Sequence, residues 1–274
     1  MKGISKVMGD SNITLSVFTK PWNKISLPEL GEFISNLGFD GIEFPLRPGF
    51  QVEPDNAEKG LTELVKEMNN YGIKVTSVAS VTTEQVFAGC AEAGIPIIRI
   101  MPKVELKDGF FASIEKIRRE IEGFYPLCEK YGVQVGIQHH FGNYLINSME
   151  VRYLIEQYDP QYIGAIWDAA HSALAGEEPE IGLEIVASHL CMVNLKNIFY
   201  KRVNGPEAES AKWKRYATTG RHGLSSWERI VRYLKKKKYK GVVCLCAEYD
   251  EEDQVNRLIA EDMAYVKSSL RMPL

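Results

Sequence analysis

Short apolar runs rich in β-branched residues recur along the chain and alternate with longer stretches that have helical periodicity. An apolar run of four to eight residues is typical of a strand buried on both faces, as in a parallel sheet. We therefore predict strands over residues 13–18, 41–44, 74–78, 97–101, 134–139, 163–168, 190–196 and 242–248. The two kinds of segment alternate from one end of the chain to the other.

Between these runs, apolar residues are spaced to form one face of a helix. This pattern predicts helices over residues 27–37, 57–71, 83–93, 111–131, 148–158, 181–187, 226–237 and 253–270. Glycines just after a helical pattern indicate helix ends, because the residue there often needs a positive φ. They are Gly38, Gly72, Gly94, Gly132 and Gly241.

Strict alternation of strands and helices with short connections requires a parallel sheet covered by helices. Eight units of about 30 residues close into a barrel more naturally than they spread into an open sheet. We predict one α/β domain over residues 1–274, a (β/α)8 TIM barrel with an outer layer of helices. A doubly wound sheet would need a glycine-rich phosphate loop after the first strand, and residues 20–23 (Lys-Pro-Trp-Asn) do not resemble one.

The longest stretch without a clear pattern, residues 199–224, follows the seventh predicted strand. Loops after barrel strands lie over the active-site face. The stretch is therefore expected to form either a lid or substrate wall, or a solvated insertion with no role.

Composition excludes several classes of protein. The chain is 45% hydrophobic and 25% charged, with a formal net charge of −3, so there is no basic field for nucleic acid. A lysine run at residues 235–238 is expected to end a helix. The start of the chain lacks a signal-peptide core, and no apolar run approaches membrane-spanning length. We expect a cytoplasmic protein without membrane or nucleic-acid partners.

The five cysteines are odd in number and scattered along the chain. Cys244 and Cys246 form Cys-x-Cys within one predicted strand, where both side chains point the same way. We interpret all five as small buried hydrophobic residues in a reduced compartment, with a zinc or redox pair as the alternative.

Alternation of side chains along each strand decides which residues point into the barrel. In the last four predicted strands the inward positions begin with small or apolar residues and end with Gln138, Asp168, Asn194 and Glu248. Buried carboxylates need a cation or hydrogen bonds to offset their desolvation. A divalent metal ion at this rim would supply that charge.

Further polar residues lie near the same rim. His140 and His171 are candidate proton shuttles, because an unperturbed histidine titrates near pH 6.5; both have a structural alternative. Lys196 either polarises a carbonyl or holds an anion, or it pairs with Glu248 or Asp168. Glu43 and Arg99 contact substrate or form a buried ion pair with each other.

Trp22, just after the first predicted strand, either forms an apolar wall for a sugar or packs within its loop. His139 is expected to point away from the barrel axis and to pack against a helix.

Several segments, in this order and spacing, resemble the xylose isomerase-like superfamily of sugar phosphate isomerases and epimerases, the AP endonuclease 2-like family that includes endonuclease IV. They are Phe39-Asp40-Gly41-Ile42-Glu43, residues 131–140, the Asp-x-x-His of Asp168 and His171, residues 193–197, residues 219–223 with Ser226-Trp227, and residues 239–248. The resemblance covers nearly the whole chain and implies a single TIM barrel.

That family binds one divalent ion through Glu, Asp, His and Glu on strands five to eight. Carried over by position, the resemblance implies the ligands Gln138, Asp168, Asn194 and Glu248. Two of the four have become amides, which leaves an all-oxygen set suited to Mn²⁺ or Mg²⁺ better than to Zn²⁺, and weaker. We therefore expect one of two alternatives: the chain binds a divalent metal weakly at these residues, or it binds none. Gln138 cannot act as a base.

The resemblance implies an enzyme that moves a proton next to a carbonyl of a carbohydrate or inositol-like substrate through an enediolate. An isomerase or epimerase with Glu248 as base, and His140 or His171 returning the proton, is the first expectation. The alternatives are a one-base keto-sugar lyase or dehydratase, and a non-catalytic sugar-binding barrel or subunit. An endonuclease IV-like function would need a histidine-rich zinc cluster, and the chain has five His. We also expect that two copies of the chain associate through the loops at this rim.

Overall fold

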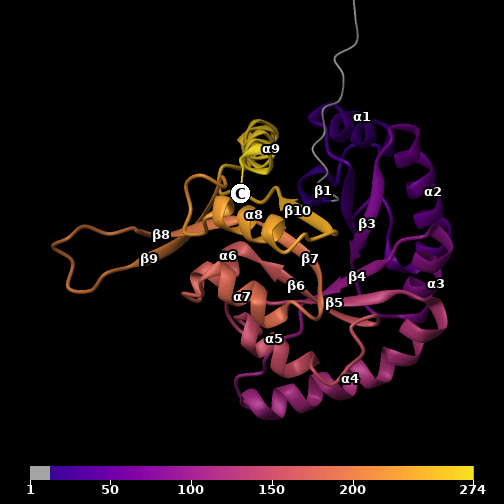
Figure 1. Ribbon diagram of the computed structural model, residues 1–274, viewed down its shortest axis with the longest axis horizontal. Helices are drawn as coiled ribbons and strands as arrows, with labels where there is room; N and C mark the ends of the chain where they lie inside the picture. Colours follow the sequence, from indigo (N-terminus) through magenta and orange to yellow (C-terminus); the bar gives the residue numbers. More distant parts are fainter. Residues whose placement is uncertain (1–12, 274) are drawn as a thin grey trace, which may run out of the picture.

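Eight parallel strands close into a barrel, as the sequence predicts (Figure 1). The computed structural model describes residues 13–273. Around the barrel the order is β1-β10-β7-β6-β5-β4-β3-β2, so the last strand in sequence pairs with the first. The strands are β1 (Thr14–Phe18), β2 (Gly41–Pro45), β3 (Lys74–Ala79), β4 (Ile97–Ile100), β5 (Gln134–Gln138), β6 (Ile163–Asp168), β7 (Leu190–Leu195) and β10 (Val242–Cys246).

Helices cover the outside of the barrel and match the predicted ones to within a few residues (Figure 1). They are α1 (Leu27–Leu37), α2 (Ala57–Asn70), α3 (Glu84–Ala93), α4 (Phe110–Tyr131), α5 (Ser148–Ile155), α7 (Pro179–Val186), α8 (Trp227–Lys236) and α9 (Val255–Arg271). Single 3-10 turns lie at Lys20–Trp22, Pro54–Asn56 and Glu252–Gln254. Four of the five predicted glycines have positive φ; Gly241 does not, and Lys238, with φ 54°, takes that conformation after α8.

One short helix, α6 (Ala169–Leu174), was not predicted. It begins directly after β6, and Asp168 caps its first turn by accepting hydrogen bonds from two backbone N–H groups. Because the strand runs into the helix without a loop, Asp168 and His171 are held close together at the end of β6.

Two apolar layers stabilise the fold. The larger fills the space between strands and helices, and the smaller fills the barrel interior with Phe18, Ala79, Ile97, Ile166, Met192, Cys244 and Cys246. Glycines on β5 and β6 make room inside: a Cβ on Gly136 would lie 2.5 Å from Ile166 Cδ1. All five cysteines are unbridged and four are buried, in line with their interpretation as small core residues.

Residues 199–224 are irregular only in part, which corrects the expectation from the sequence. Strands β8 (Asn197–Arg202) and β9 (Trp213–Thr218) pair antiparallel into a hairpin that projects away from the barrel (Figure 1). Its base contacts the rim, where Arg215 lies 3.8 Å from the Phe141 ring centroid and Lys214 pairs with Asp250 at 2.7 Å. Its pattern was missed because most side chains between 199 and 215 are exposed on both faces of the hairpin.

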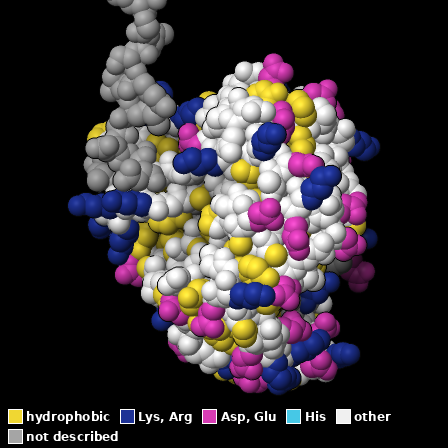
Figure 2. Space-filling model, turned by 90° about the vertical axis from the view of Figure 1, so that its right-hand side faces the viewer, with side chains coloured by type: hydrophobic (Ala, Val, Ile, Leu, Met, Phe, Trp, Pro, Cys, Tyr) yellow, Lys and Arg dark blue, Asp and Glu magenta, His cyan; other side chains and the backbone are white. Residues whose placement is uncertain are grey.

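Charged side chains are mixed on the outer face that carries α2 and α3, where Figure 2 shows Lys and Arg interspersed with Asp and Glu. This mixture agrees with the near-neutral net charge and gives that face no field of one sign. Within residues 13–273, none of the helices combines the length and apolar character needed to cross a bilayer.

Candidate active site

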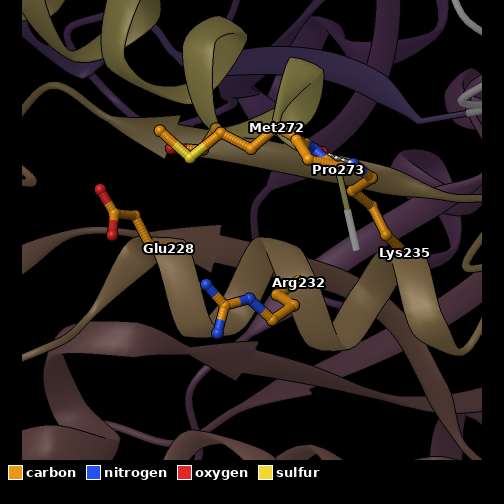
Figure 3. A pocket seen from close by; sticks show the side chains of 6 residues that line it. Glu228, Arg232, Lys235, Met272 and Pro273 are labelled. Carbon is orange, nitrogen blue, oxygen red and sulfur yellow. Dashed lines mark hydrogen bonds between the residues drawn. The ribbon is translucent and has the colours of Figure 1, made fainter.

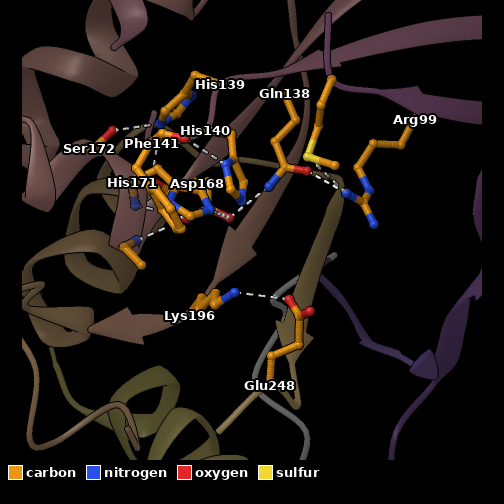
Figure 4. Close-up of polar contacts among 12 residues, drawn as sticks. Arg99, Gln138, His139, His140, Phe141, Asp168, His171, Ser172, Lys196 and Glu248 are labelled. Carbon is orange, nitrogen blue, oxygen red and sulfur yellow. Dashed lines mark hydrogen bonds and ion pairs between the residues drawn. The ribbon is translucent and has the colours of Figure 1, made fainter. Parts of the chain in front are cut away.

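A cavity of about 100 Å³ opens at the carboxyl ends of the barrel strands and gathers most of the predicted site residues (Figure 4). It is lined by Phe18, Lys20, Arg47, Arg99, Met101, Gln138, His140, Asp168, His171, Lys196, Cys246 and Glu248. No residue of the stretch 199–224 is among them, so of the two alternatives for this stretch the solvated insertion agrees better with the cavity lining.

Asp168 lies at the floor of this cavity with both carboxylate oxygens engaged. Oδ1 accepts hydrogen bonds from the backbone N–H groups of Ala170 (3.0 Å) and His171 (3.1 Å), and Oδ2 accepts one from Gln138 Nε2 at 2.8 Å. Burial alone would raise the pKa of Asp168, but the ionisable groups around it and these donors lower it overall. Asp168 is therefore an ionised, fully hydrogen-bonded anchor.

Gln138 links Asp168 to a buried ion pair. Its Oε1 accepts a hydrogen bond from Arg99 Nη1 at 2.5 Å, and Arg99 Nε lies 2.7 Å from Glu43 Oε1. Burial would lower the pKa of Arg99, but Glu43 raises it above its usual value. Glu43 itself is fully buried and does not line the cavity, which agrees with the buried ion pair, the second of its two alternatives, and not with a substrate contact of Glu43.

Glu248 lies between two lysines on the opposite side of the cavity. Lys196 Nζ is 2.9 Å from Oε2 and Lys20 Nζ is 2.5 Å from Oε1. Burial would raise the pKa of Glu248, but the two ammonium groups lower it far below its usual value. In turn Glu248 raises the pKa of Lys196, which burial would otherwise lower.

Glu248 reaches the cavity from a turn and not from the strand that we predicted for it. The strand β10 ends at Cys246, and the Glu248 N–H donates to the Cys246 carbonyl at 2.8 Å. This tight turn directs the carboxylate over the barrel mouth.

Two histidines lie together against the cavity, with ring centroids 4.1 Å apart (Figure 4). His140 Nδ1 is 2.9 Å from the Phe141 carbonyl oxygen. A carbonyl accepts only, so Nδ1 carries the proton and Nε2 of the neutral ring is unprotonated. Burial lowers the pKa of His140 below 6.5 and that of His171 to about 3, so both rings are neutral at pH 7.

His139 points away from the cavity, as predicted. Its Nε2 is hydrogen-bonded to the Asp168 carbonyl (3.1 Å) and to Ser172 Oγ (3.0 Å) on α6. It therefore supports the β6–α6 junction.

Besides Glu43, the structure places two further predicted residues outside the cavity. Trp22 is buried in the outer core, where Nε1 donates to Asn256 Oδ1 at 2.8 Å and the ring packs on Phe33. Asn194 is fully buried and does not line the cavity, and neither of its amide atoms has a hydrogen-bond partner in residues 13–273. Trp22 is therefore a packing residue, as its alternative interpretation had it.

The donor set of this rim does not fit the expected divalent ion. The acceptor atoms of Gln138, Asp168 and Glu248 already face Arg99, backbone N–H groups and two lysines, and Asn194, although it pairs in register with Asp168, does not line the cavity. In the described part of the chain no three His, Cys, Asp or Glu side chains gather in an arrangement that could hold a metal. Lysine and arginine supply the positive charge at this rim.

Two charged lining residues were missed by the sequence argument. Lys20 follows the first strand by two residues, and Arg47 follows the second by two. Their place on the first and second strand-to-helix loops was the signal that could have identified them, because such loops form the active-site face.

A second hollow lies between α8 and the end of α9, away from the barrel mouth (Figure 3). It is lined by Glu228, Arg232, Lys235, Ser269, Met272 and Pro273. Lys235 Nζ donates to the carbonyl oxygens of Leu270 (3.0 Å) and Met272, so its charge holds the end of α9 in place. None of the predicted site residues lies there.

Comparison with known proteins identifies relatives of the whole barrel. The family model described as xylose isomerase-like TIM barrel matches residues 32–269. An inosose dehydratase of Mesomycoplasma hyopneumoniae (strain 7448) is 22% identical over 280 residues, covering 90% of this chain and 92% of the relative.

Two solved structures share the fold. A D-psicose 3-epimerase from Clostridium cellulolyticum H10 superposes with a TM-score of 0.71 at 14% identity, covering 94% of this chain and all of the other. A probable 3-DHS dehydratase from Bacillus anthracis superposes with a TM-score of 0.69 at 14% identity, covering 93% of this chain and 98% of the other. At this level of identity the likeness concerns the fold.

Proposed function

The chain belongs to the xylose isomerase-like TIM barrel family, and from this premise we propose that it is a dehydratase of a keto-sugar or keto-cyclitol. In this reaction a base takes the proton next to a ketone, and the hydroxyl group one carbon further leaves as water. The observation that carries the proposal is one unprotonated imidazole nitrogen beside one buried ammonium group in the same cavity.

His140 is the proposed base. Its Nδ1–H···O=C bond to Phe141 fixes the tautomer, so Nε2 is available to accept a proton from carbon. Glu248, our first choice from the sequence, is a weaker base, because two lysines hold its pKa far below the usual range. The structure thus supports moving this role from Glu248 to His140.

Lys196 is the proposed electrophile. Its side chain is 11% exposed and lines the cavity, and Glu248 keeps it protonated. An ammonium group in such a site stabilises the negative charge that forms on the ketone oxygen when the neighbouring carbon loses its proton. This is the task that a metal ion would perform in a site with suitable ligands.

The same imidazole then completes the elimination. The proton that His140 has taken from carbon passes to the departing hydroxyl group, the C–O bond breaks, and a C=C bond forms conjugated with the ketone. Water and an enone leave, and His140 is neutral again. The substrate alone therefore gives the enone and one water molecule, and no further reactant is needed.

Dehydration suits this site better than two-base epimerisation. An epimerase needs a second acid or base on the opposite face of the carbon, and the position that the resemblance implies for it holds Gln138. An amide cannot exchange that proton, and Gln138 is already bonded to Arg99 and Asp168. The inosose dehydratase relative supports the same choice.

The test is proton NMR in D₂O with a panel of inososes and keto-sugars. Loss of water with a new enone signal supports the dehydratase. Deuterium incorporation with an epimer and no enone identifies an epimerase, and binding without exchange identifies a sugar-binding barrel; either result overturns the proposal. His140→Gln should abolish turnover, while His222→Gln, which changes an exposed histidine outside the cavity, should not.

A further inference from the structure

Among residues 13–273, Arg47 is the cation of the cavity without an ion-pair partner. It lies two residues after β2 on the loop that follows this strand, and its side chain is partly buried against the cavity. The other three lining cations are paired: Lys20 and Lys196 with Glu248, and Arg99 with Glu43. Within residues 13–273, Arg47 forms no ion pair and its guanidinium donates no hydrogen bond.

The charges of the cavity do not cancel. Four cations line it, and they face the carboxylates of Asp168 and Glu248 and the buried carboxylate of Glu43 beneath Arg99. Both lining histidines are neutral, because burial lowers their pKa values. One positive charge is therefore left over. Glu43 and Glu248 act on Arg47 only from beyond ion-pair distance, so within residues 13–273 Arg47 is the lining cation that carries this charge unpaired.

The Arg47 guanidinium lies beside an aromatic ring and a second guanidinium group. Its Cζ lies 5.9 Å from the Phe18 ring centroid, and Arg99 Cζ lies 4.7 Å from the same ring. Two guanidinium groups beside one ring repel each other, and the pKa of Arg47 is lowered by its burial and then by Arg99. A guanidinium kept in such surroundings has its forked N–H donors ready for an anion with two oxygens.

We infer that the substrate carries an oxyanionic group, a carboxylate or a phosphate, which Arg47 binds at the Phe18 side of the cavity. The inference rests on the proposed function, since the anion is placed on the same keto-substrate that His140 and Lys196 act on. It changes the substrate class from a neutral polyol to an acidic or phosphorylated one. A neutral inosose would leave Arg47 without a partner.

Binding of three matched probes tests this without turnover. D-glucose, D-glucuronate and D-glucose 6-phosphate differ only in the group at one carbon, and their affinities can be measured by calorimetry at constant ionic strength. A charge-assisted hydrogen bond corresponds to about a 10- to 100-fold gain in affinity. We expect that gain for one charged probe, and the better of the two distinguishes carboxylate from phosphate.

Variants locate the effect. Arg47→Gln should remove the preference for the charged probe, Arg47→Lys should retain part of it, and Arg257→Gln, at an exposed arginine on α9, should leave it unchanged. The inference is overturned if neither charged probe binds more tightly than glucose, or if folded Arg47→Gln keeps the full preference. A protein that shows the preference but forms no enone retains this inference and loses the proposed dehydration.

Discussion

Lys196 Nζ lies 2.9 Å from Glu248 Oε2, so an ammonium group occupies the side of the rim where the resemblance to the family implied a metal ion. The contact joins the end of β7 to the turn after β10, and it leaves both residues charged. The positive charge that a metal ion would have supplied is thus supplied by the Lys196 side chain.

Activity should therefore survive removal of divalent metals. With Gln138, Asp168 and Glu248 already bonded to Arg99, backbone N–H groups and lysines, no free ligand set remains for Mn²⁺ or Mg²⁺. We expect turnover after treatment with EDTA and dialysis to equal that of the untreated protein, and added Mn²⁺ to change it by less than about twofold. Loss of activity that Mn²⁺ restores would show that a metal takes part.

Lys196→Met should lower turnover by about 10²- to 10³-fold, the range found when one donor to a developing oxyanion is removed. Lys20→Met is the matched control: Lys20 pairs with the same carboxylate, but its side chain is 47% exposed against 11% for Lys196. Steady-state kinetics on both variants should assign the loss in kcat to Lys196. Equal losses in the two variants would mean that only the charge state of Glu248 matters.

The pH profile should identify the base. His140 must be neutral to accept a proton, and burial lowers its pKa below 6.5. We expect kcat/KM to be constant at neutral pH and to fall as the pH decreases through that lowered pKa. If Glu248 were the base, the profile would stay flat into a far more acidic range, because its pKa is much lower.

His171 should make the fold sensitive to mild acid. Its pKa is about 3 in the folded protein against about 6.5 in an unfolded chain. Below pH 6.5 only the unfolded state gains this proton, so the stabilisation present above pH 6.5 is lost progressively toward pH 3. At pH 5 the loss amounts to about 2 kcal/mol at most.

Urea unfolding at pH 7 and pH 5 measures this effect. His171→Gln should lose less stability between the two pH values than the wild type does. Other titrating groups, including Asp262 with its pKa raised to about 6, cancel in this difference. Identical losses in both proteins would mean that His171 takes up its proton as readily when folded.

Patterning predicted the barrel because the strands are buried on both faces and carry the apolar runs that this burial requires. The alternation of side chains along each strand also predicted that Gln138, Asp168 and Lys196 lie at one rim, because the direction of a strand side chain depends on the backbone alone. This alternation did not show that Asn194, which pairs in register with Asp168, stays out of the cavity lining, and it failed at Glu248, which leaves the ladder in a turn.

The pairing of side chains could not be read from the sequence. Whether Arg99 reaches Gln138, or Lys20 reaches Glu248, depends on loop conformations and on contacts across 39 and 228 residues. The hairpin of β8 and β9 was missed for a related reason: it is exposed on both faces and leaves no apolar alternation to detect.

The contact of Lys20 with Glu248 crosses the seam where β1 pairs with β10. Until β10 has been synthesised and has closed the barrel, the proposed electrophile Lys196 lacks Glu248, the carboxylate that pairs with it, although its own strand is already present. A nascent chain folding from its first strands onward would thus assemble most of the cavity wall early. It would gain the charge arrangement for chemistry only in the last step of closure, so the appearance of activity reports on completed folding.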